Sequence, residues 1–430
     1  MRRVVLISID GLAAFYWDDP AVKAPTLRAL ASRGVVAGRM ETVFPSTTWP
    51  THATLVTGVR PARHGVVANR VLNRATGRAE DLTGDPIYDA ADLLEVPTVY
   101  DVAHAAGIRT AAIDWPATRH AATLDFNLPF FKSQAVFETH TAPAVWAELR
   151  ALGYPVDRQG QWAALPQRFL KDAMVADLAA RVVRGREPGL LLVHFLCADS
   201  FQHLYGPRSP EAYWAIEYID GLVGRFLGAL PPGELDDRTT VFVVSDHGFL
   251  PVSREIRVNV HLRRLGLLAA EEGGGRGEGA RFVVNSGVGW IYALGDGTPG
   301  AIVPELAREL GKLPGVARVL TGDDFSGVGL PAPGQHRHLG DLMLEAEEGY
   351  AFAEDSAGDE VIGAPRHRGT HGQIPTRPDL GAFFLAAGAG VGRDRRIAAL
   401  ASRDVAPTIA QVLGVTLPPG EGRVLTEIFD

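Results

Sequence analysis

Seven side chains that could bind metal ions or attack phosphorus lie where we expect a strand to end or a helix to begin. They are Asp10 in VVLISIDG, Thr48 in FPSTTWPTHATLVTG, Asp199 and His203 in HFLCADSFQHLYGP, Asp246 and His247 in VFVVSDHGF, and His371 in RHRGTHG. Three carboxylates, three imidazoles and one hydroxyl suit two divalent ions that prefer oxygen and nitrogen ligands. With an attacking threonine oxygen between the two ions, this set predicts phosphoryl-transfer chemistry.

The spacing of the acidic and histidine residues favours shared metal sites. Asp199 and His203 are four residues apart, so a helical turn would place both on one face, within reach of a single ion. A D-x-x-x-H pair alone is more often a solvated surface pair, but this one follows a buried strand. Asp246 and His247 are consecutive and face one metal only if the chain turns there, which Gly248 permits.

Thr48 is the candidate nucleophile. An alcohol is a weak nucleophile and needs a neighbouring cation or base to remove its proton. Pro50 and the segment 52–57 predict that Thr48 lies at a helix N-terminus, where backbone amides and the helix dipole favour both an alkoxide and a phosphate. An ordinary helix cap is the alternative, and the adjacent hydroxyls of Ser46 and Thr47 leave the register open by one residue.

The chain alternates between buried strands and amphipathic helices. We expect strands at residues 4–9, 110–113, 190–195, 240–244 and 381–385, and helices at 24–33, 98–106, 210–230 and 405–413. This alternation predicts a doubly wound, mostly parallel α/β sheet, which binds ligands at the carboxyl ends of its strands. Asp10, Asp199 and Asp246 come at or just after such ends.

The pattern changes after residue 250 and predicts a small α+β insertion. The segment 271–279, EEGGGRGEG, is typical of a flexible surface loop. Further elements are expected at 290–294, 302–313, 317–320 and 342–345. We therefore expect a discontinuous catalytic core of residues 1–282 and 346–430, interrupted by an insertion at 283–345. His371 would belong to the second part of the core, which follows the insertion.

Composition limits the classes of partner. A chain of 430 residues with 46% hydrophobic residues can bury one large core or two unequal ones. The net charge of −8 argues against a nucleic-acid polymer, because such binders usually carry a basic face. A small phosphorylated substrate is compatible, since metal ions supply positive charge locally. The oligomeric state stays open.

The sequence favours a cytoplasmic enzyme without a membrane segment. Cys197 is the one cysteine, so no intrachain disulfide can form, and it is expected to be buried in a strand. The apolar run in MRRVVLISIDG is too short for a signal peptide and ends in a candidate metal ligand. No stretch approaches the roughly 20 apolar residues of a membrane span.

Taken in order, the motifs resemble those of the alkaline phosphatase superfamily, and in particular its nucleotide pyrophosphatase/phosphodiesterase branch. The shared pattern is a strand ending in D-G, a nucleophilic threonine in a T-x-P-N-H-like turn, then D-x-x-x-H, S-D-H-G and G-T-H-G, across residues 4–372. The resemblance implies two divalent metals, zinc or alternatively manganese. It assigns Asp199, His203 and His371 to one ion, and Asp10, Asp246, His247 and Thr48 to the other.

The resemblance also implies a mechanism and two substrate contacts. Thr48 would attack phosphorus to form a phospho-threonine, which water then hydrolyses. The family's asparagine three positions after the nucleophile is replaced here by Thr51, whose shorter hydroxyl puts diester activity in doubt. Trp115 in AIDWPAT, or alternatively Trp49, is expected to stack on a base or leaving group, unless it packs in the core.

Other functions are kept as alternatives. Phosphonoacetate hydrolases and phosphomonoesterases of the superfamily add lysine or arginine groups, and Arg119 and Lys132 are the only nearby candidates in the corresponding stretch. An inactive scaffold of the same fold is the alternative from another class, and the metal content of purified protein would distinguish it. The remaining candidate histidines are expected to support the site rather than to bind metal: His52, His64, His194 and His367.

Overall fold

The computed structural model describes residues 2–83, 88–268, 279–295 and 302–430. The glycine-rich loop expected at 271–279 lies outside the described residues, except for Gly279, which begins a strand. No helix in these described ranges is long and apolar enough to cross a membrane.

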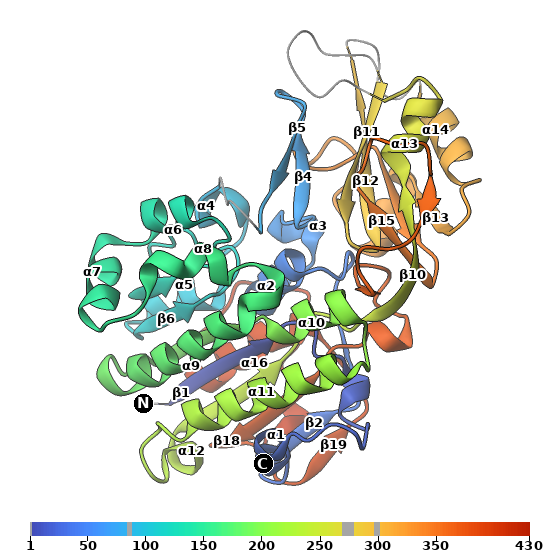
Figure 1. The fold of residues 1–430 in the computed structure, drawn as a ribbon. Coiled ribbons are helices and arrows are strands. Elements are labelled where there is room, and N and C mark those ends of the chain that lie inside the picture. Colours follow the sequence, from blue (N-terminus) through green and yellow to red (C-terminus); the bar gives the residue numbers. More distant parts are fainter. Residues whose placement is uncertain (1, 84–87, 269–278, 296–301) are drawn as a thin grey trace.

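An eight-stranded sheet forms the centre of the molecule (Figure 1). Its order is β19 (Arg395–Ile397), β2 (Gly34–Ala37), β18 (Phe384–Gly388), β9 (Thr239–Val244), β1 (Arg3–Ile9), β8 (Leu190–Phe195), β6 (Thr110–Ile113) and β7 (Phe126–Leu128). In this sheet β18 alone runs against its neighbours, and the other strands are parallel. The predicted mostly parallel α/β fold is confirmed.

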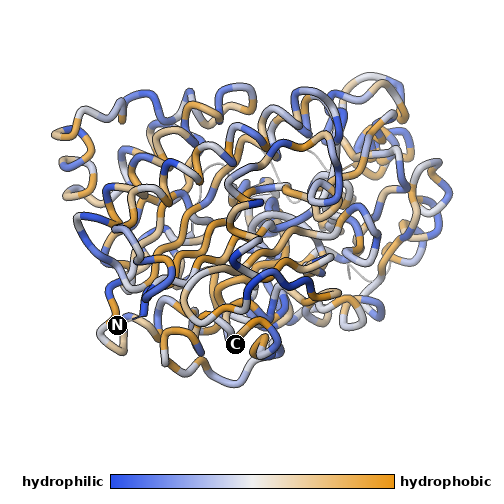
Figure 2. The backbone as a smooth tube through the Cα atoms, turned by 90° about the horizontal axis from the view of Figure 1, so that it is seen from below, coloured by the Kyte–Doolittle hydropathy of each residue, from blue (hydrophilic) through white to orange (hydrophobic). Residues whose placement is uncertain are grey.

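Helices cover both faces of the sheet because the buried strands carry apolar residues on both sides. In β1, Val5 and Ile7 pack toward one face and Val4 and Leu6 toward the other. The first face is covered by α1 (Pro25–Ala31), α9 (Arg168–Gly185), α10 (Cys197–Tyr205) and α11 (Pro210–Leu227). The second is covered by α2 (Thr48–Thr57), α5 (Val99–Ala105) and α16 (Val405–Leu413). Figure 2 shows the hydrophobic segments gathered in the interior between these layers.

A second lobe rises beyond the carboxyl ends of the strands (Figure 1). It contains an antiparallel sheet of β11 (Gly279–Asn285), β12 (Val288–Leu294), β14 (Leu342–Ala346) and β13 (Val316–Leu320). Two helices pack against this sheet, α13 (Val258–Arg264) and α14 (Val303–Leu310). Beside them, β10 (Leu250–Arg257) pairs with β15 (Gly349–Ala353). The expected boundary at residue 283 therefore falls inside β11, and the lobe also takes in strands on either side of the expected insertion.

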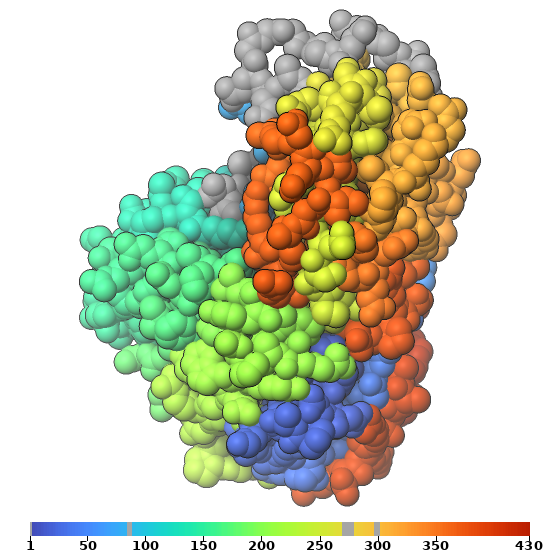
Figure 3. All heavy atoms as spheres, turned by 45° about the vertical axis from the view of Figure 1, so that its right-hand side comes forward, coloured from blue at the N-terminus to red at the C-terminus, as the bar shows by residue number. Residues whose placement is uncertain are grey.

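A helical lobe faces the α+β lobe across the top of the sheet. It contains α6 (Gln134–His140), α7 (Pro143–Ala151), α8 (Gln159–Trp162) and the short helix η3 (Leu165–Gln167), which leads into α9. Figure 3 shows the two lobes as separate protrusions above the core. None of these helices had been expected from the sequence.

Smaller elements complete the described chain. They are β3 (Met40–Glu41), β20 (Leu400–Ala401), β4 (Arg70–Asn73), β5 (Arg78–Asp81), β16 (Ile362–Gly363), β17 (Gly369–Thr370), α3 (Pro61–His64), α4 (Ala90–Leu93), α12 (Glu234–Asp237) and α15 (Gly322–Phe325), together with short 3-10 turns.

Candidate active site

The candidate metal ligands gather at the carboxyl ends of three adjacent strands. Asp10 directly follows β1, and Asp246 and His247 follow β9, its neighbour. Asp199 and His203 lie on α10, which begins just after β8 on the other side of β1. Parallel pairing of these strands brings their ends to one edge of the sheet, so residues far apart in sequence meet there.

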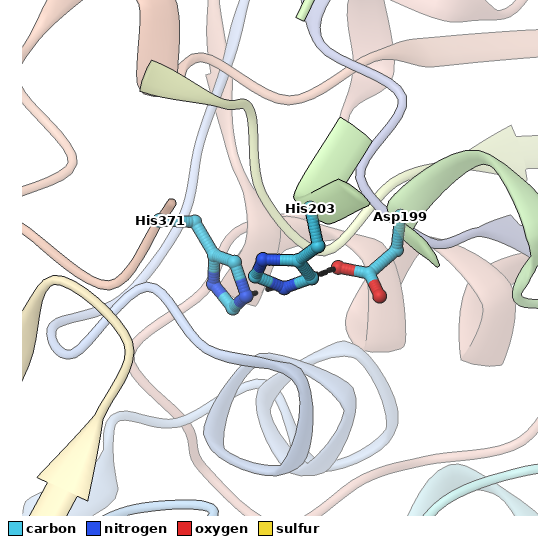
Figure 4. Close-up of side chains that lie close together, drawn as sticks. All are labelled: Asp199, His203 and His371. Atoms are coloured by element: carbon cyan, nitrogen blue, oxygen red, sulfur yellow. Dashed lines mark ion pairs between the residues drawn. The ribbon is translucent and has the colours of Figure 1, made fainter. Parts of the chain in front are cut away.

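Asp199, His203 and His371 form the first ligand group (Figure 4). The Oδ1 atom of Asp199 lies 3.2 Å from Nε2 of His203 and 3.8 Å from Nε2 of His371. The Nδ1 atom of His203 bonds to the carbonyl oxygen of Gly369 at 2.9 Å, and that of His371 to the carbonyl oxygen of Ser46 at 3.0 Å. Because Nδ1 is the donor in both rings, both Nε2 lone pairs are left to bind an ion.

The second ligand group lies around His247. Its Nε2 atom is 3.3 Å from Oδ1 of Asp10 and 3.3 Å from Oδ2 of Asp246. Ligand atoms of Asp10, Asp199 and His247 also lie within 4.8 Å of one another. The His247 ring stacks on His371, with centroids 3.5 Å apart, so the two groups are immediate neighbours. This arrangement brings together the two ligand sets that the sequence analysis assigned to separate ions.

Unpaired buried atoms show that these residues fit a pair of cations. Oδ1 of Asp10, Oδ1 of Asp199, Oδ2 of Asp246 and Nε2 of His247 are buried and have no hydrogen-bond partner. Leaving such atoms unpaired is costly, and coordination of an ion would satisfy them. Separations of 3.2–3.3 Å between ligand atoms also suit ligands held ~2.0–2.1 Å from one zinc ion.

The electrostatics of the second group favour bound positive charge. Burial raises the pKa of Asp246 to about 7, and the negative charge of Asp10 adds to this shift. Burial lowers the pKa of His247, but the carboxylates of Asp246 and Asp10 outweigh it and raise that pKa to about 9. Without a metal the group therefore holds protons on the atoms that would bind one. Metal binding is expected to displace these protons.

His194 forms a hydrogen bond with the carboxylate of Asp10. Its Nε2 atom lies 3.1 Å from Oδ2 of Asp10, and its Nδ1 atom 3.0 Å from the carbonyl oxygen of Asp114. Both partners are acceptors, so both ring nitrogens donate and the imidazole is protonated. Burial lowers the pKa of His194, but the hydrogen bond and charge of Asp10 outweigh it and raise the pKa overall. His194 thus holds one oxygen of Asp10 and leaves the other for a metal.

Two of the other histidines stay in the interior and one reaches the cavity. His52 bonds to the Ser8 hydroxyl at 2.9 Å and to the Thr48 carbonyl oxygen at 2.8 Å, which ties α2 to β1. His64, at the end of α3, bonds to the hydroxyl of Thr54 on α2 at 3.0 Å. His367 lines the cavity beside His203.

Thr48 is the first residue of α2 and lines the cavity, together with Asp10 and Asp199. The two neighbouring hydroxyls do not share this position. Thr47 is fully buried, and its Oγ1 atom has no partner. Ser46 is also buried and donates to the carbonyl oxygen of Gln373 at 2.8 Å. Of these three adjacent hydroxyl residues, only Thr48 lines the cavity.

The cavity above the metal ligands has a volume of about 320 Å³ and is lined by both lobes. This size is sufficient for a small organic phosphate. Its apolar lining includes Trp49, Phe130, Leu165, Leu196 and Phe352, and its polar lining beyond the metal ligands includes Asn69, Arg70, Lys132, Arg168 and Asn285. Apart from Trp49 and Lys132, none of these residues was a candidate from the sequence, because none occupies a defining position of a motif.

Residues 4–373 match the family model described as type I phosphodiesterase / nucleotide pyrophosphatase. The chain belongs to this family. An uncharacterized pyrophosphatase/phosphodiesterase of Schizosaccharomyces pombe is 28% identical over 259 residues, which cover 58% of this chain and 45% of that protein. Human ectonucleotide pyrophosphatase/phosphodiesterase family member 5 is 23% identical over 436 residues, covering 98% of this chain and 76% of the relative.

A solved structure supports the fold of this family member. Murine ectonucleotide pyrophosphatase/phosphodiesterase 5 superposes with a TM-score of 0.74 at 20% sequence identity, and the match covers 100% of both chains. At this level of identity the similarity establishes the fold. The chemistry is argued from the residues of the site.

Two substrate contacts expected from the sequence lie elsewhere. Thr51 is fully buried and does not line the cavity, because it faces the core one turn after Thr48. Trp115 is also fully buried, and its ring packs edge-on against His52 at 4.9 Å. Neither side chain reaches the position of a substrate, so both assignments are corrected. Trp49, the alternative aromatic residue, does line the cavity.

Asn69 presents a side-chain amide to the cavity that Thr48 also lines. Its Oδ1 atom accepts a hydrogen bond from the Trp49 backbone N–H at 2.8 Å. This bond orients the amide and leaves the Nδ2 group as a donor. The backbone N–H of Asn69 is itself held by Oδ1 of Asn285 at 3.0 Å. The presence of Thr51 is therefore no argument against diester cleavage.

Proposed function

We propose that this chain is a two-metal phosphoric ester hydrolase, a nucleotide phosphodiesterase or pyrophosphatase in which Thr48 is the nucleophile. The observation that carries the proposal is the cluster of unpaired buried atoms of Asp10, Asp199, Asp246 and His247. Two members of this cluster, Asp10 and Asp199, line the same cavity as Thr48. Membership of the family supports the same reaction. Because the chain spans 45% of the Schizosaccharomyces pombe relative, the activity is argued from this site.

The residues of the chain perform distinct parts of the reaction. The Thr48 oxygen loses its proton and forms a bond to phosphorus as the bond to the leaving oxygen breaks. Water then adds its oxygen to phosphorus and returns a proton to the Thr48 oxygen, which releases a phosphomonoester when the substrate is a diester. The N-terminus of α2 and the Asn69 amide donate toward the non-bridging oxygens, where negative charge develops. The metals, when bound, supply positive charge for the attacking and departing oxygens.

We propose zinc as the metal, with manganese as the alternative. Imidazole and carboxylate ligands at these separations suit zinc, and the family resemblance points the same way. A cytoplasmic location stays a prediction that cell fractionation would test.

A small nucleotide fits the proposed substrate class. A threonine-to-alanine form of the murine protein, described as inactive, was solved in complex with AMP. In the present chain the apolar residues Trp49 and Phe130 line the cavity beside Thr48, where they would pack against an organic group on phosphorus.

The test is a substrate panel with metal-stripped and reconstituted protein. Zinc or manganese should restore hydrolysis of bis(4-nitrophenyl) phosphate and of a dinucleotide, with lower specificity constants for 4-nitrophenyl phosphate and phosphonoacetate. Preference for the monoester or the phosphonate by tenfold or more, about 1.4 kcal/mol, would contradict the diesterase proposal. A folded protein that binds no metal and hydrolyses none of these compounds would favour the scaffold alternative.

A further inference from the structure

Lys132 presents an ammonium group to the active-site cavity. It follows β7, and its Nζ atom donates to the Thr83 hydroxyl at 2.6 Å and lies 3.5 Å from Oδ2 of Asp81. Its side chain is 36% exposed. An ammonium has three donors, so these contacts hold the group in place and leave a donor for a ligand.

Arg168, the first residue of α9, lines the same cavity. Its Nε atom donates to the Ala163 carbonyl oxygen at 3.1 Å, and its Nη1 atom lies 3.1 Å from the Ser200 hydroxyl and 3.3 Å from Oδ2 of Asp199. The side chain is 9% exposed, so the guanidinium is held rigidly. In the described part of the chain its hydrogen bonds use Nε and Nη1, which leaves Nη2 to contact a ligand.

The charges of these two residues act on one another across the cavity. Burial lowers the pKa of Lys132, and the charge of Arg168 lowers it further, while Asp81 opposes both effects. Arg70 also lines the cavity, where its guanidinium forms an ion pair with Glu354. Lys132 and Arg168 have carboxylate partners too, Asp81 and Asp199, but each keeps a donor beyond them. An anion between the two cations would be attracted to both.

We propose that Lys132 and Arg168 form an anion subsite that binds a second oxyanion of the substrate, a phosphate or carboxylate carried apart from the reacting phosphorus. This inference rests on the proposed function and predicts that, among its substrates, the enzyme prefers esters with a second anionic group. The sequence had offered no basic pair, because the two residues are far apart in the chain. Arg119, the other basic residue considered there, lies 2.8 Å from Asp89 and does not line this cavity.

The experiment compares esters that differ only in one distant charge. Phenyl 4-nitrophenyl phosphate, its 4-carboxyphenyl analogue and its 4-phosphonophenyl analogue share the 4-nitrophenolate leaving group. Zinc-loaded protein should prefer the anionic esters by about tenfold in kcat/KM, and the two analogues distinguish a carboxylate subsite from a phosphate subsite. Lys132→Gln should abolish most of this preference, and Lys132→Arg should retain it. The control Lys312→Gln changes an exposed lysine that pairs with Glu309 and should leave the preference intact.

Binding without turnover separates the subsite from catalysis. In zinc-loaded Thr48→Ala protein, calorimetry should show about tenfold tighter binding of the anionic esters, about 1.4 kcal/mol, and adding Lys132→Gln should remove the difference. Equal affinities for all three esters, or an equal loss for all three in Lys132→Gln, would overturn the subsite. If the protein hydrolyses all three esters with equal kcat/KM, the anion subsite is wrong and the proposed function stands. If the protein binds the anionic esters more tightly but hydrolyses none of the three, the proposed function is wrong and the anion subsite stands.

Discussion

The base and the wall of the cavity are built in different ways. The base, which comprises Thr48 and the six candidate metal ligands, lies at the ends of β1, β8 and β9 or on segments packed against them. The wall is formed by Asn69, Phe130, Lys132, Leu165, Arg168 and Phe352, which come from loops, short elements and the start of α9. The position of the base is set by the core sheet, whereas that of the wall depends on how the two lobes pack above it.

Because of this difference, we assign the reaction to the base of the cavity and the choice of substrate to its wall. Strand pairing fixes β1 between β8 and β9 over its whole length, so the ligands cannot shift without breaking the core. The wall can change residue by residue while the sheet stays intact. We therefore expect changes in the base to affect chemistry and metal content, and changes in the wall to affect which ester binds.

The largest effect is expected at the nucleophile. Thr48→Ala should lower kcat by at least about a thousandfold, because no other hydroxyl of the segment 46–48 lines the cavity. Metal content and the melting temperature should stay near those of the wild type. Thr47→Ala is the matched control, since its side chain is buried away from the cavity. Substantial turnover by Thr48→Ala together with an inactive Thr47→Ala would transfer the nucleophile to the neighbouring residue.

The next effect concerns metal stoichiometry. His203→Ala and His247→Ala should each retain about one ion per chain where the wild type holds about two, because the two imidazoles belong to different ligand groups. Metal analysis after gel filtration measures this directly. His104→Ala, on α5, removes a half-exposed imidazole outside both groups and should retain both ions. If both ligand variants hold as much metal as the control, the assignment is wrong.

The base could be predicted from the sequence and most of the wall could not, for a physical reason. The ligands Asp10, Asp199, His203, Asp246 and His247 follow strands recognisable from their own apolar runs. His371 has no such run before it and was found from the short motif GTHG. The helices between residues 134 and 185 and the placement of Arg168 depend on packing between distant segments. Thr51 and Trp115 were misplaced because spacing along the chain does not show which side of a helix or strand faces the core.

A smaller effect is expected in the apolar part of the wall. Leu165→Ala should raise KM for an aryl or nucleoside ester about three- to tenfold, with a lesser change in kcat, because it removes apolar contact far from phosphorus. Leu170→Ala removes the same atoms from an exposed position on α9 that does not line the cavity. Steady-state kinetics of both variants measure the changes in KM and kcat. A KM change shared equally by the two would mean that the wall does not contact the substrate.

The smallest effect concerns α9, which links the wall to the base. Arg168 begins this helix, and the buried carboxylate of Asp172 accepts the backbone N–H groups of Leu196 at 3.0 Å and Cys197 at 2.8 Å, at the start of α10. Burial raises the pKa of Asp172 from 3.8 to about 7, against the effect of these two hydrogen bonds. Between these values the folded protein holds a proton that the unfolded chain has lost. Stability from this group is therefore present at low pH and declines as pH rises toward 7.

Asp172→Asn tests this link, because the amide oxygen can still accept a backbone N–H while the side chain no longer titrates. The free energy of unfolding of the wild type, minus that of Asp172→Asn, should fall from pH 5 to pH 7 and level off at higher pH. Urea unfolding of both zinc-loaded proteins across this range measures the difference, and pH effects common to both cancel. A difference that stays constant or grows with pH would show that Asp172 is charged throughout, and that the connection between wall and base relies on an ionised cap.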